Sequence, residues 1–349
     1  MRKIGVLTSG GDSPGMNAAV VSVARTAAMY GIPLIGVKRG YNGLLRTKNR
    51  MQDDLTEMPL DLVLDIADNP GTYLRTARCL EFLDPFYRQK AVDTLAMMDI
   101  VGLVVIGGDG SFQGAMRLCE LGVPCVGIPG TIDNDLPYTE MTLGFDTAVN
   151  VCVDAVRAIR ATSRSHDRSA VVEVMGRHCG DIALHTAVST GSEIVLVPEV
   201  KWSVEEVAER LRKLIAHGNT RNTIVAAEGC WASMKPFDNY KYLKSKGVEV
   251  WEKNPMNAKT LAQVLRHMCP GSEARATVLG YTQRGPQPTA RDATFAFEAG
   301  HMAVNLLRDG VGSQVIGRKK GKVFHMDMVT ALQEKRHFNK KMYELVNKL

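Results

Sequence analysis

Short apolar runs recur along the chain, and most of them lead into a polar turn that contains glycine and then into a segment with helical periodicity. Residues 3–8 enter the turn 9–15, and residues 102–106 enter the turn 107–111. Apolar runs of this length are typical of buried strands, and their alternation with helices is typical of parallel sheets. The pattern therefore predicts an α/β fold with helices on both faces of the sheets.

The same order of strand, glycine-bearing turn and helix returns in the second half of the chain. The predicted strand 170–174 ends in the turn 175–180 before a helical segment, and the predicted strand 223–227 ends at Glu228. This repetition predicts two similar Rossmann-like domains of three layers each, with mainly parallel sheets. Residues 235–268 are less regular and rich in lysine and aromatic residues, with a helix-like end from Ala258, which predicts a surface insertion.

Composition and charge exclude several classes of protein. The chain has 349 residues, a formal net charge of +6 and 45% hydrophobic residues, which is ordinary for a globular enzyme. No apolar run approaches the roughly 20 residues of a membrane helix, and the amino terminus lacks a signal-peptide layout, so we expect a cytoplasmic protein. The seven cysteines form no C-x-x-C pair, which argues against a disulfide framework or a zinc site. The only basic run, 318–320, has no aromatic neighbours, which disfavours nucleic-acid binding.

Two loops are candidates for chemistry. The loop 129–135 follows an apolar run and carries the carboxylates Asp133 and Asp135, where α/β sheets bind their ligands. In the loop 107–111, glycines let the backbone approach phosphate oxygens, and Asp109 suits a magnesium ion that bridges phosphates. Either loop alone is equally compatible with an ordinary turn, but the two together favour a site. The chain has no P-loop motif and no complete Gly-x-Gly-x-x-Gly fingerprint, which argues against those two nucleotide-binding classes.

Five motifs, in order and at close spacing, carry a family resemblance: GVLTSGGD (5–12), GGDGS (107–111), PGTIDND (129–135), VMGR (174–177) and LGYTQRG (279–285). Through them the chain resembles the ATP-dependent 6-phosphofructokinases over nearly its whole length. The resemblance implies a glycolytic kinase that transfers the ATP γ-phosphoryl group to the 1-hydroxyl of fructose 6-phosphate. It also implies an ATP-binding domain of residues 1–144 with 283–333, a fructose 6-phosphate-binding domain of residues 145–282 with 334–349, and an active site in the cleft between them.

The resemblance assigns catalytic roles that chemistry makes reasonable. An alcohol is a poor nucleophile at neutral pH, so a carboxylate must accept its proton during attack. The resemblance gives this role to Asp133, and it gives the binding of Mg²⁺ to Asp109 and Asp135. Cations must neutralise charge on the transferring group. The other catalytic residues implied by the resemblance are Arg78, Arg177 and Gly11.

Two larger sets of residues are implied to contact the substrates. The nucleotide-contacting positions are Gly11, Tyr41, Arg78, Cys79, Gly108, Asp109, Gly110 and Ser111. The sugar-phosphate positions are Thr131, Ile132, Asp133, Arg168, Met175, Gly176, Arg177, Glu228, Arg275, Tyr281 and Arg284. Of these, the resemblance implies that the 6-phosphate is bound by Arg168, Arg275, Tyr281 and Arg284. The family supplies the residues at positions 168 and 275 from an adjacent subunit, which implies a homotetramer with shared active sites.

Two glycines bear on the choice of phosphoryl donor. Pyrophosphate-using relatives generally carry aspartate at the position of Gly110 and lysine at that of Gly130, where they fill the space of an ATP α-phosphate. Both positions are glycine here, which favours ATP over the alternative of a pyrophosphate-dependent enzyme. A second alternative is a non-catalytic paralogue that binds sugar phosphates, but such a chain should lack Asp133 or Asp109. Tyr281 replaces the histidine of most ATP-using members, so sugar-phosphate choice could differ.

Overall fold

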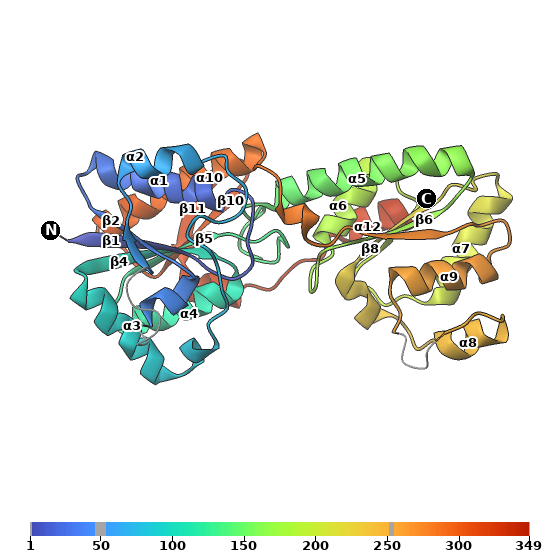
Figure 1. Ribbon diagram of the computed structural model, residues 1–349, viewed down its shortest axis with the longest axis horizontal. Helices are drawn as coiled ribbons and strands as arrows, with labels where there is room; N and C mark the ends of the chain where they lie inside the picture. The colour runs from blue at the N-terminus through green and yellow to red at the C-terminus, as the bar shows by residue number, and fades with distance from the viewer. Residues whose placement is uncertain (1, 46–53, 251–254, 349) are drawn as a thin grey trace. The chain divides into compact units, whose positions relative to one another are not determined.

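The computed structural model describes residues 2–45, 54–250 and 255–348, and the chain divides into two compact units. Unit 1 comprises Met1–Thr147 and Arg284–Arg336, and unit 2 comprises Ala148–Gln283 and His337–Leu349 (Figure 1). Among the helices of these described ranges, none has the length and apolarity needed to cross a membrane.

Unit 1 is built on a seven-stranded sheet in the order β11-β10-β5-β4-β1-β2-β3. Neighbours from β10 to β2 pair in parallel, and the edge strands β3 and β11 are antiparallel. The strands are β1 (Lys3–Thr8), β2 (Leu34–Val37), β3 (Leu55–Glu57), β4 (Ile100–Gly107), β5 (Cys125–Pro129), β10 (Gln314–Lys319) and β11 (Lys322–Asp327).

Helices cover both faces of this sheet because its central strands are apolar on both sides. Val6 and Val104 face one core together with α1 and α10, whereas Leu7 and Val105 face the other with α3, α4 and α11. Figure 1 shows α1 and α10 on one side of the sheet and α3 and α4 on the other. The helical segments are α1 (Met16–Met29), η1 (Gly40–Leu44), α2 (Leu60–Val63), η2 (Leu64–Ile66), η3 (Leu80–Leu83), α3 (Pro85–Met97), α4 (Asp109–Glu120), α10 (Ala290–Arg308) and α11 (Met328–Gln333). The helix α5 (Phe145–His166) begins in unit 1 and continues into unit 2.

Unit 2 contains a four-stranded, fully parallel sheet in the order β7-β8-β6-β9. Its strands are β6 (Ala170–Val174), β7 (Ile194–Leu196), β8 (Thr223–Ala227) and β9 (Arg275–Val278). Helices α7 to α9 pack on one face, and α5, α6 and α12 lie on the other (Figure 1). The helical segments are α6 (Asp181–Thr190), α7 (Val204–Ala216), η4 (Glu228–Ser233), α8 (Asn239–Ser245), α9 (Ala258–Met268), η5 (Gly280–Arg284) and α12 (Lys340–Asn347).

The predicted α/β fold with mainly parallel sheets is confirmed. The prediction of a surface insertion over 235–268 is wrong for its last third, because α9 buries Leu261, Val264 and Leu265 in the core of unit 2. Their spacing places all three on one face of the helix. The sequence also missed the hairpin of β10 and β11, whose two-residue turn has positive φ angles, as type I′ hairpin turns require. The functions given to the two predicted domains stay predictions.

Candidate active site

Three loops of unit 1 lie at the carboxyl ends of β1, β4 and β5, which are neighbours in the sheet. The backbone N–H of Ser9 donates to the Ile106 carbonyl at 2.9 Å, and that of Gly130 donates to the Gly107 carbonyl at 2.9 Å. Because adjacent parallel strands end at one edge, the loops 9–15, 107–111 and 129–135 are brought together. The structure therefore unites the candidate loops of the first half of the chain.

Glycines in these loops differ in the space around them. A Cβ at Gly107 would lie 2.6 Å from the Ser9 carbonyl oxygen, so only glycine lets these two loops approach so closely. A Cβ at Gly130 would lie 2.8 Å from Met16 Cε and 3.3 Å from the Gly107 nitrogen. At Gly110 a Cβ would meet nothing within 4 Å. Position 110, in the first turn of α4, is therefore open, and position 130 is crowded.

The loop after β5 presents its two carboxylates through an unusual turn. Asn134 adopts a left-handed conformation with φ of 53°, and its side-chain oxygen accepts from the backbone N–H of Thr142 at 3.0 Å. The Asp133 N–H donates to the Thr131 hydroxyl at 3.2 Å. Burial raises the pKa of Asp135, and the charges of Asp133 and Asp109 raise it further. Asp135 is thus close enough to both other carboxylates to be repelled by their charge.

This carboxylate group fits a magnesium ion. Asp135 Oδ1 is buried and accepts no hydrogen bond from the described residues, although buried carboxylate oxygens are normally paired. Asp109 lies exposed at the start of α4. Magnesium is usually held by one or two carboxylates together with substrate phosphates and water. Asp109 and Asp135 supply that number of ligands, and a cation there would relieve their mutual repulsion.

Other predicted nucleotide-side residues differ in exposure. Arg78 is exposed, and its carbonyl accepts from the Asn42 amide at 3.1 Å. Tyr41 is only 4% exposed and stacks on Phe82, while its hydroxyl donates to the Ser111 carbonyl at 2.5 Å. The contact of Tyr41 with a nucleotide stays a prediction. In this structure its hydroxyl group holds the first turn of α4 through Ser111. Cys79 is partly exposed.

Sugar-side residues of unit 1 are also placed. Ile132 is fully buried, so its side chain packs inside unit 1 and leaves only backbone atoms for a ligand. Thr131 is partly exposed, and its carbonyl accepts from the Thr142 hydroxyl at 2.6 Å. Arg284 Nη1 donates to the Asp12 carbonyl at 2.6 Å and would lie 3.0 Å from a Cβ at Gly11. This guanidinium, predicted to bind the sugar 6-phosphate, therefore lies against the first glycine turn.

In unit 2, the predicted residues Met175, Gly176, Arg177 and Glu228 follow the carboxyl ends of β6 and β8. Gly176 has φ of 125°, and its carbonyl accepts from the Gly229 N–H at 3.1 Å. A Cβ at Gly229 would lie 1.9 Å from the Arg177 carbonyl oxygen, so the two loops meet only because that residue is glycine. The structure brings these four residues together and leaves Arg177 and Glu228 exposed.

The predicted 6-phosphate residues fall at opposite ends of the same sheet. Arg275 pairs with Ala170 at the amino ends of β9 and β6, and Arg168 lies two residues before Ala170. Tyr281 follows the carboxyl end of β9 and is 83% exposed. The five residues of β6 span about 16 Å at about 3.3 Å each, so Arg168 and Arg275 lie well away from Met175 in the same chain. Arg168 is paired instead with Glu273 at 2.9 Å.

Comparison with known proteins decides the family. A family model described as phosphofructokinase matches residues 3–307. The chain belongs to the phosphofructokinase family. The ATP-dependent 6-phosphofructokinase of Clostridioides difficile is 46% identical over 99% of this chain and 98% of its own length. That of Paenibacillus macquariensis is 42% identical over 100% of this chain and 99% of its own length.

A solved structure supports the same assignment. Phosphofructokinase from Saccharomyces cerevisiae is 33% identical and superposes with a TM-score of 0.80 over 95% of this chain. This chain spans 45% of the yeast chain. The family resemblance predicted from the five motifs is thus confirmed.

Two buried residues of this phosphofructokinase were missed by the sequence predictions. Gln283 is fully buried and bonds to the Met175 amide, and Asp292 is fully buried beneath the start of α5. Asp292 accepts from the N–H groups of Gly144 and Thr147 at 2.9 and 2.8 Å, and burial raises its pKa to about 6. The sequence does carry a signal for Asp292, which lies three residues after the N-cap Thr289. An acidic residue at that position is typical of the start of a helix.

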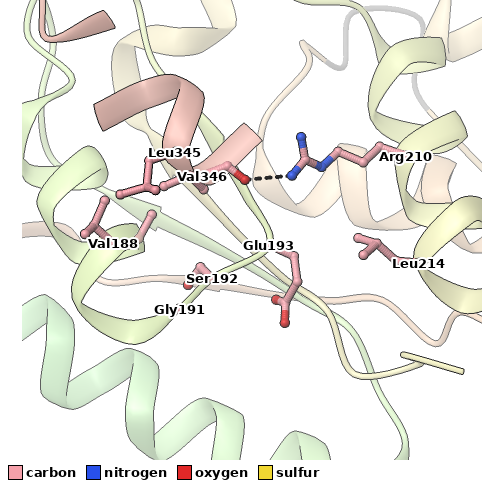
Figure 2. A pocket seen from close by; sticks show the side chains of 9 residues that line it. Val188, Gly191, Ser192, Glu193, Arg210, Leu214, Leu345 and Val346 are labelled. Carbon is pink, nitrogen blue, oxygen red and sulfur yellow. Dashed lines mark hydrogen bonds between the residues drawn. The ribbon is translucent and has the colours of Figure 1, made fainter. Parts of the chain in front are cut away.

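A separate cavity of about 310 Å³ in unit 2 of the phosphofructokinase is lined by none of the predicted site residues (Figure 2). It lies beside α6, α7 and α12 and is largely apolar. Arg210 Nη2 donates to the Val346 carbonyl at 2.6 Å (Figure 2). The Glu193 carboxylate accepts from the Thr223 N–H at 2.7 Å. Both charged groups are therefore engaged in holding the fold.

Proposed function

We propose that this chain is an ATP-dependent 6-phosphofructokinase, which transfers the γ-phosphoryl group of ATP to the 1-hydroxyl of fructose 6-phosphate and so yields fructose 1,6-bisphosphate. Two relatives with this activity in their names match nearly the whole chain at 42% and 46% identity. The observation that carries the proposal is the placement of Asp133 and Asp109 on neighbouring strand-end loops beside an open position at Gly110. Cytoplasmic glycolysis is the setting that this activity implies.

Asp133 is the proposed general base. Its carboxylate accepts the proton of the sugar hydroxyl as the hydroxyl oxygen forms a bond to the γ-phosphorus and ADP leaves with the electrons of the broken P–O bond. The hydrogen bond from the Thr142 N–H to the Asn134 side chain fixes the backbone directly after Asp133. This limits how the Asp133 carboxylate can move. A carboxylate held in a fixed orientation toward the sugar hydroxyl favours the proton transfer.

The remaining charge on the transferring group is proposed to be balanced by Arg78 and Arg177, both of which are exposed to an incoming ligand. Gly11 is exposed and has no side chain, so phosphate oxygens can approach its backbone N–H. Asp109 and Asp135 would hold Mg²⁺. When bound, the ion neutralises phosphate charge and orients the nucleotide.

Initial rates with two donors and two acceptors test the proposal. ATP with fructose 6-phosphate should give turnover at least about a hundredfold faster than pyrophosphate with the same sugar, since Gly110 leaves room for an α-phosphate. Sedoheptulose 7-phosphate serves as the second acceptor and tests the effect of Tyr281. Faster turnover with pyrophosphate would favour the pyrophosphate-dependent alternative, and absence of turnover with either donor would favour the non-catalytic paralogue.

We also propose that active sites are shared between subunits of a homotetramer. Arg168 and Arg275 lie at the amino end of the unit 2 sheet, whereas Met175 and Tyr281 lie at its carboxyl end. One phosphate cannot contact both ends of a sheet in the same chain, so a second chain must supply Arg168 and Arg275 if they bind the same 6-phosphate as Tyr281.

Hybrid oligomers test this sharing. Arg275→Ala and Asp133→Ser chains should each be nearly inactive alone, and their coexpression should recover activity, because some sites combine Asp133 of one chain with Arg275 of another. The control mixes the two variants after separate purification, under conditions in which the oligomers do not exchange subunits. Two affinity tags, one on each variant, verify that hybrid oligomers have formed. If these hybrids are no more active than the sum of the two variants alone, shared sites are contradicted.

A further inference from the structure

We propose that Gln283 is a positioning residue for fructose 6-phosphate, which ties the sugar-phosphate segment Gly280–Arg284 to the Met175 backbone. The inference rests on the proposed function and adds to it a residue that does not itself contact substrate. Gln283 is fully buried, although amide side chains are usually exposed. It lies inside η5, between the exposed residues of this segment.

Every polar atom of the Gln283 amide has a partner within unit 2. Oε1 accepts from the Met175 N–H at 3.2 Å and from the Cys152 thiol at 3.0 Å, and Nε2 donates to the Gly280 carbonyl at 2.7 Å. Met175 is the residue that directly follows β6, and Gly280 directly precedes Tyr281. One amide therefore joins the two backbone segments that carry proposed sugar-phosphate contacts.

The orientation of this amide is fixed by its neighbours. A backbone N–H can only donate and a backbone carbonyl can only accept, so the oxygen must face Met175 and the nitrogen must face Gly280. Burial raises the pKa of Cys152 to about 12, which keeps the thiol protonated as a second donor to the oxygen. A flipped amide would place donors against donors.

The next residue extends the connection. Arg284 Nη1 donates to the Asp12 carbonyl beside Gly11 in unit 1, whereas the described partners of the Gln283 side chain all belong to unit 2. Consecutive residues are thus held by the two different units. Loss of the Gln283 contacts should loosen Met175 and Tyr281 while the hydrogen bond at Asp12 remains, so the sugar side should suffer and the nucleotide side should not.

The first test replaces Gln283 by leucine, which has a similar size and no polar atom. The KM for fructose 6-phosphate should rise about tenfold to a hundredfold, because the Met175 N–H and the Gly280 carbonyl lose their partner. The KM for ATP should stay within about twofold of the wild-type value. Gln89→Leu, the same replacement outside the predicted site, is the matched control and should leave both KM values within about twofold, since Gln89 is exposed and its amide donates to the Asp93 carboxylate at 2.9 Å.

A second variant, Gln283→Glu, keeps the inference testable if the leucine variant does not fold. A protonated glutamic acid has one acceptor for Met175 and one donor for Gly280, like the native amide, and a buried carboxyl has a raised pKa. The ratio of its KM for fructose 6-phosphate to that of the wild type should therefore fall toward one as pH is lowered from about 8.5 to 6. The leucine variant should show a ratio that does not change with pH.

Three results would overturn the inference: an unchanged sugar-phosphate KM in a folded, active leucine variant, equal rises in both KM values, or a glutamate variant whose ratio ignores pH. Calorimetric binding of fructose 6-phosphate to the wild type separates this failure from failure of the proposed function. A wild-type chain that binds no fructose 6-phosphate overturns both proposals, whereas a wild-type chain that binds it leaves only the role of Gln283 at stake.

Discussion

Replacing Asp133 by serine should lower kcat for phosphorylation of fructose 6-phosphate by about 10²–10⁴-fold, the usual contribution of a general base. The KM for the sugar phosphate should stay within a few fold, because the lost interaction matters in the transition state and little in the ground state. Steady-state rates with a coupled assay for ADP measure both constants. Serine is preferred to asparagine because it cannot revert to aspartate by deamidation.

A carboxylate from the same region serves as the control. Glu140 is exposed, and the only described hydrogen bond of its carboxylate is from the Lys320 N–H at 2.8 Å. Glu140→Ser should leave kcat within about twofold, as is usual for surface positions away from a site. Near-normal turnover in the Asp133→Ser enzyme, with the control also active, would reject Asp133 as the base.

Replacing Gly110 by aspartate should lower kcat/KM for ATP by about a hundredfold or more. A carboxylate at this position would stand where the α-phosphate is expected, and the juxtaposition of like charges costs several kcal/mol. The fold should tolerate the change, because a Cβ at Gly110 meets nothing within 4 Å and acidic residues are favourable in the first turn of a helix. Thermal unfolding and ATP kinetics of the variant provide the measurement.

Gly110→Ala is the matched control, since it adds a methyl group without charge in the same open space. It should retain the ATP kinetics of the wild type and should stabilise α4 by about 0.5–1 kcal/mol, the usual difference between glycine and alanine in a helix. If the alanine variant loses ATP activity as severely as the aspartate variant, then bulk and not charge is decisive. Unchanged ATP kinetics in the aspartate variant would remove Gly110 as a donor-selecting position.

The central strands of both sheets could be predicted because their apolar runs are continuous and each ends in a glycine-bearing turn. The edge strands of the seven-stranded sheet could not. Leu55–Glu57 has only three residues, which is too short to show an alternating pattern, and Lys322–Asp327 is largely exposed on an edge. The helix Ala258–Met268 carries an apolar stripe, but the lysine-rich sequence before it suggested an exposed segment.

The loops of the site could be located from sequence because polar residues that follow buried strands must meet at one edge of a parallel sheet. The separation of Arg275 from Met175 could not, since it depends on which residue of β9 pairs with Ala170. Burial of Tyr41 was likewise hidden, because it results from packing against Phe82 and the start of α4. Sequence shows which residues end a strand, whereas pairing and packing decide which of them share a ligand.

The contrast between the open surroundings of Gly110 and the crowded ones of Gly130 has an evolutionary consequence. An ancestor drifting from one phosphoryl donor toward the other could acquire a side chain at 110 in a single step. At 130 the new Cβ would lie 2.8 Å from Met16 Cε, the flexible end of a side chain, so the methionine must move aside as the side chain is gained. A shorter residue at position 16 would remove this contact, and it is the accompanying change to seek in reconstructed lineages.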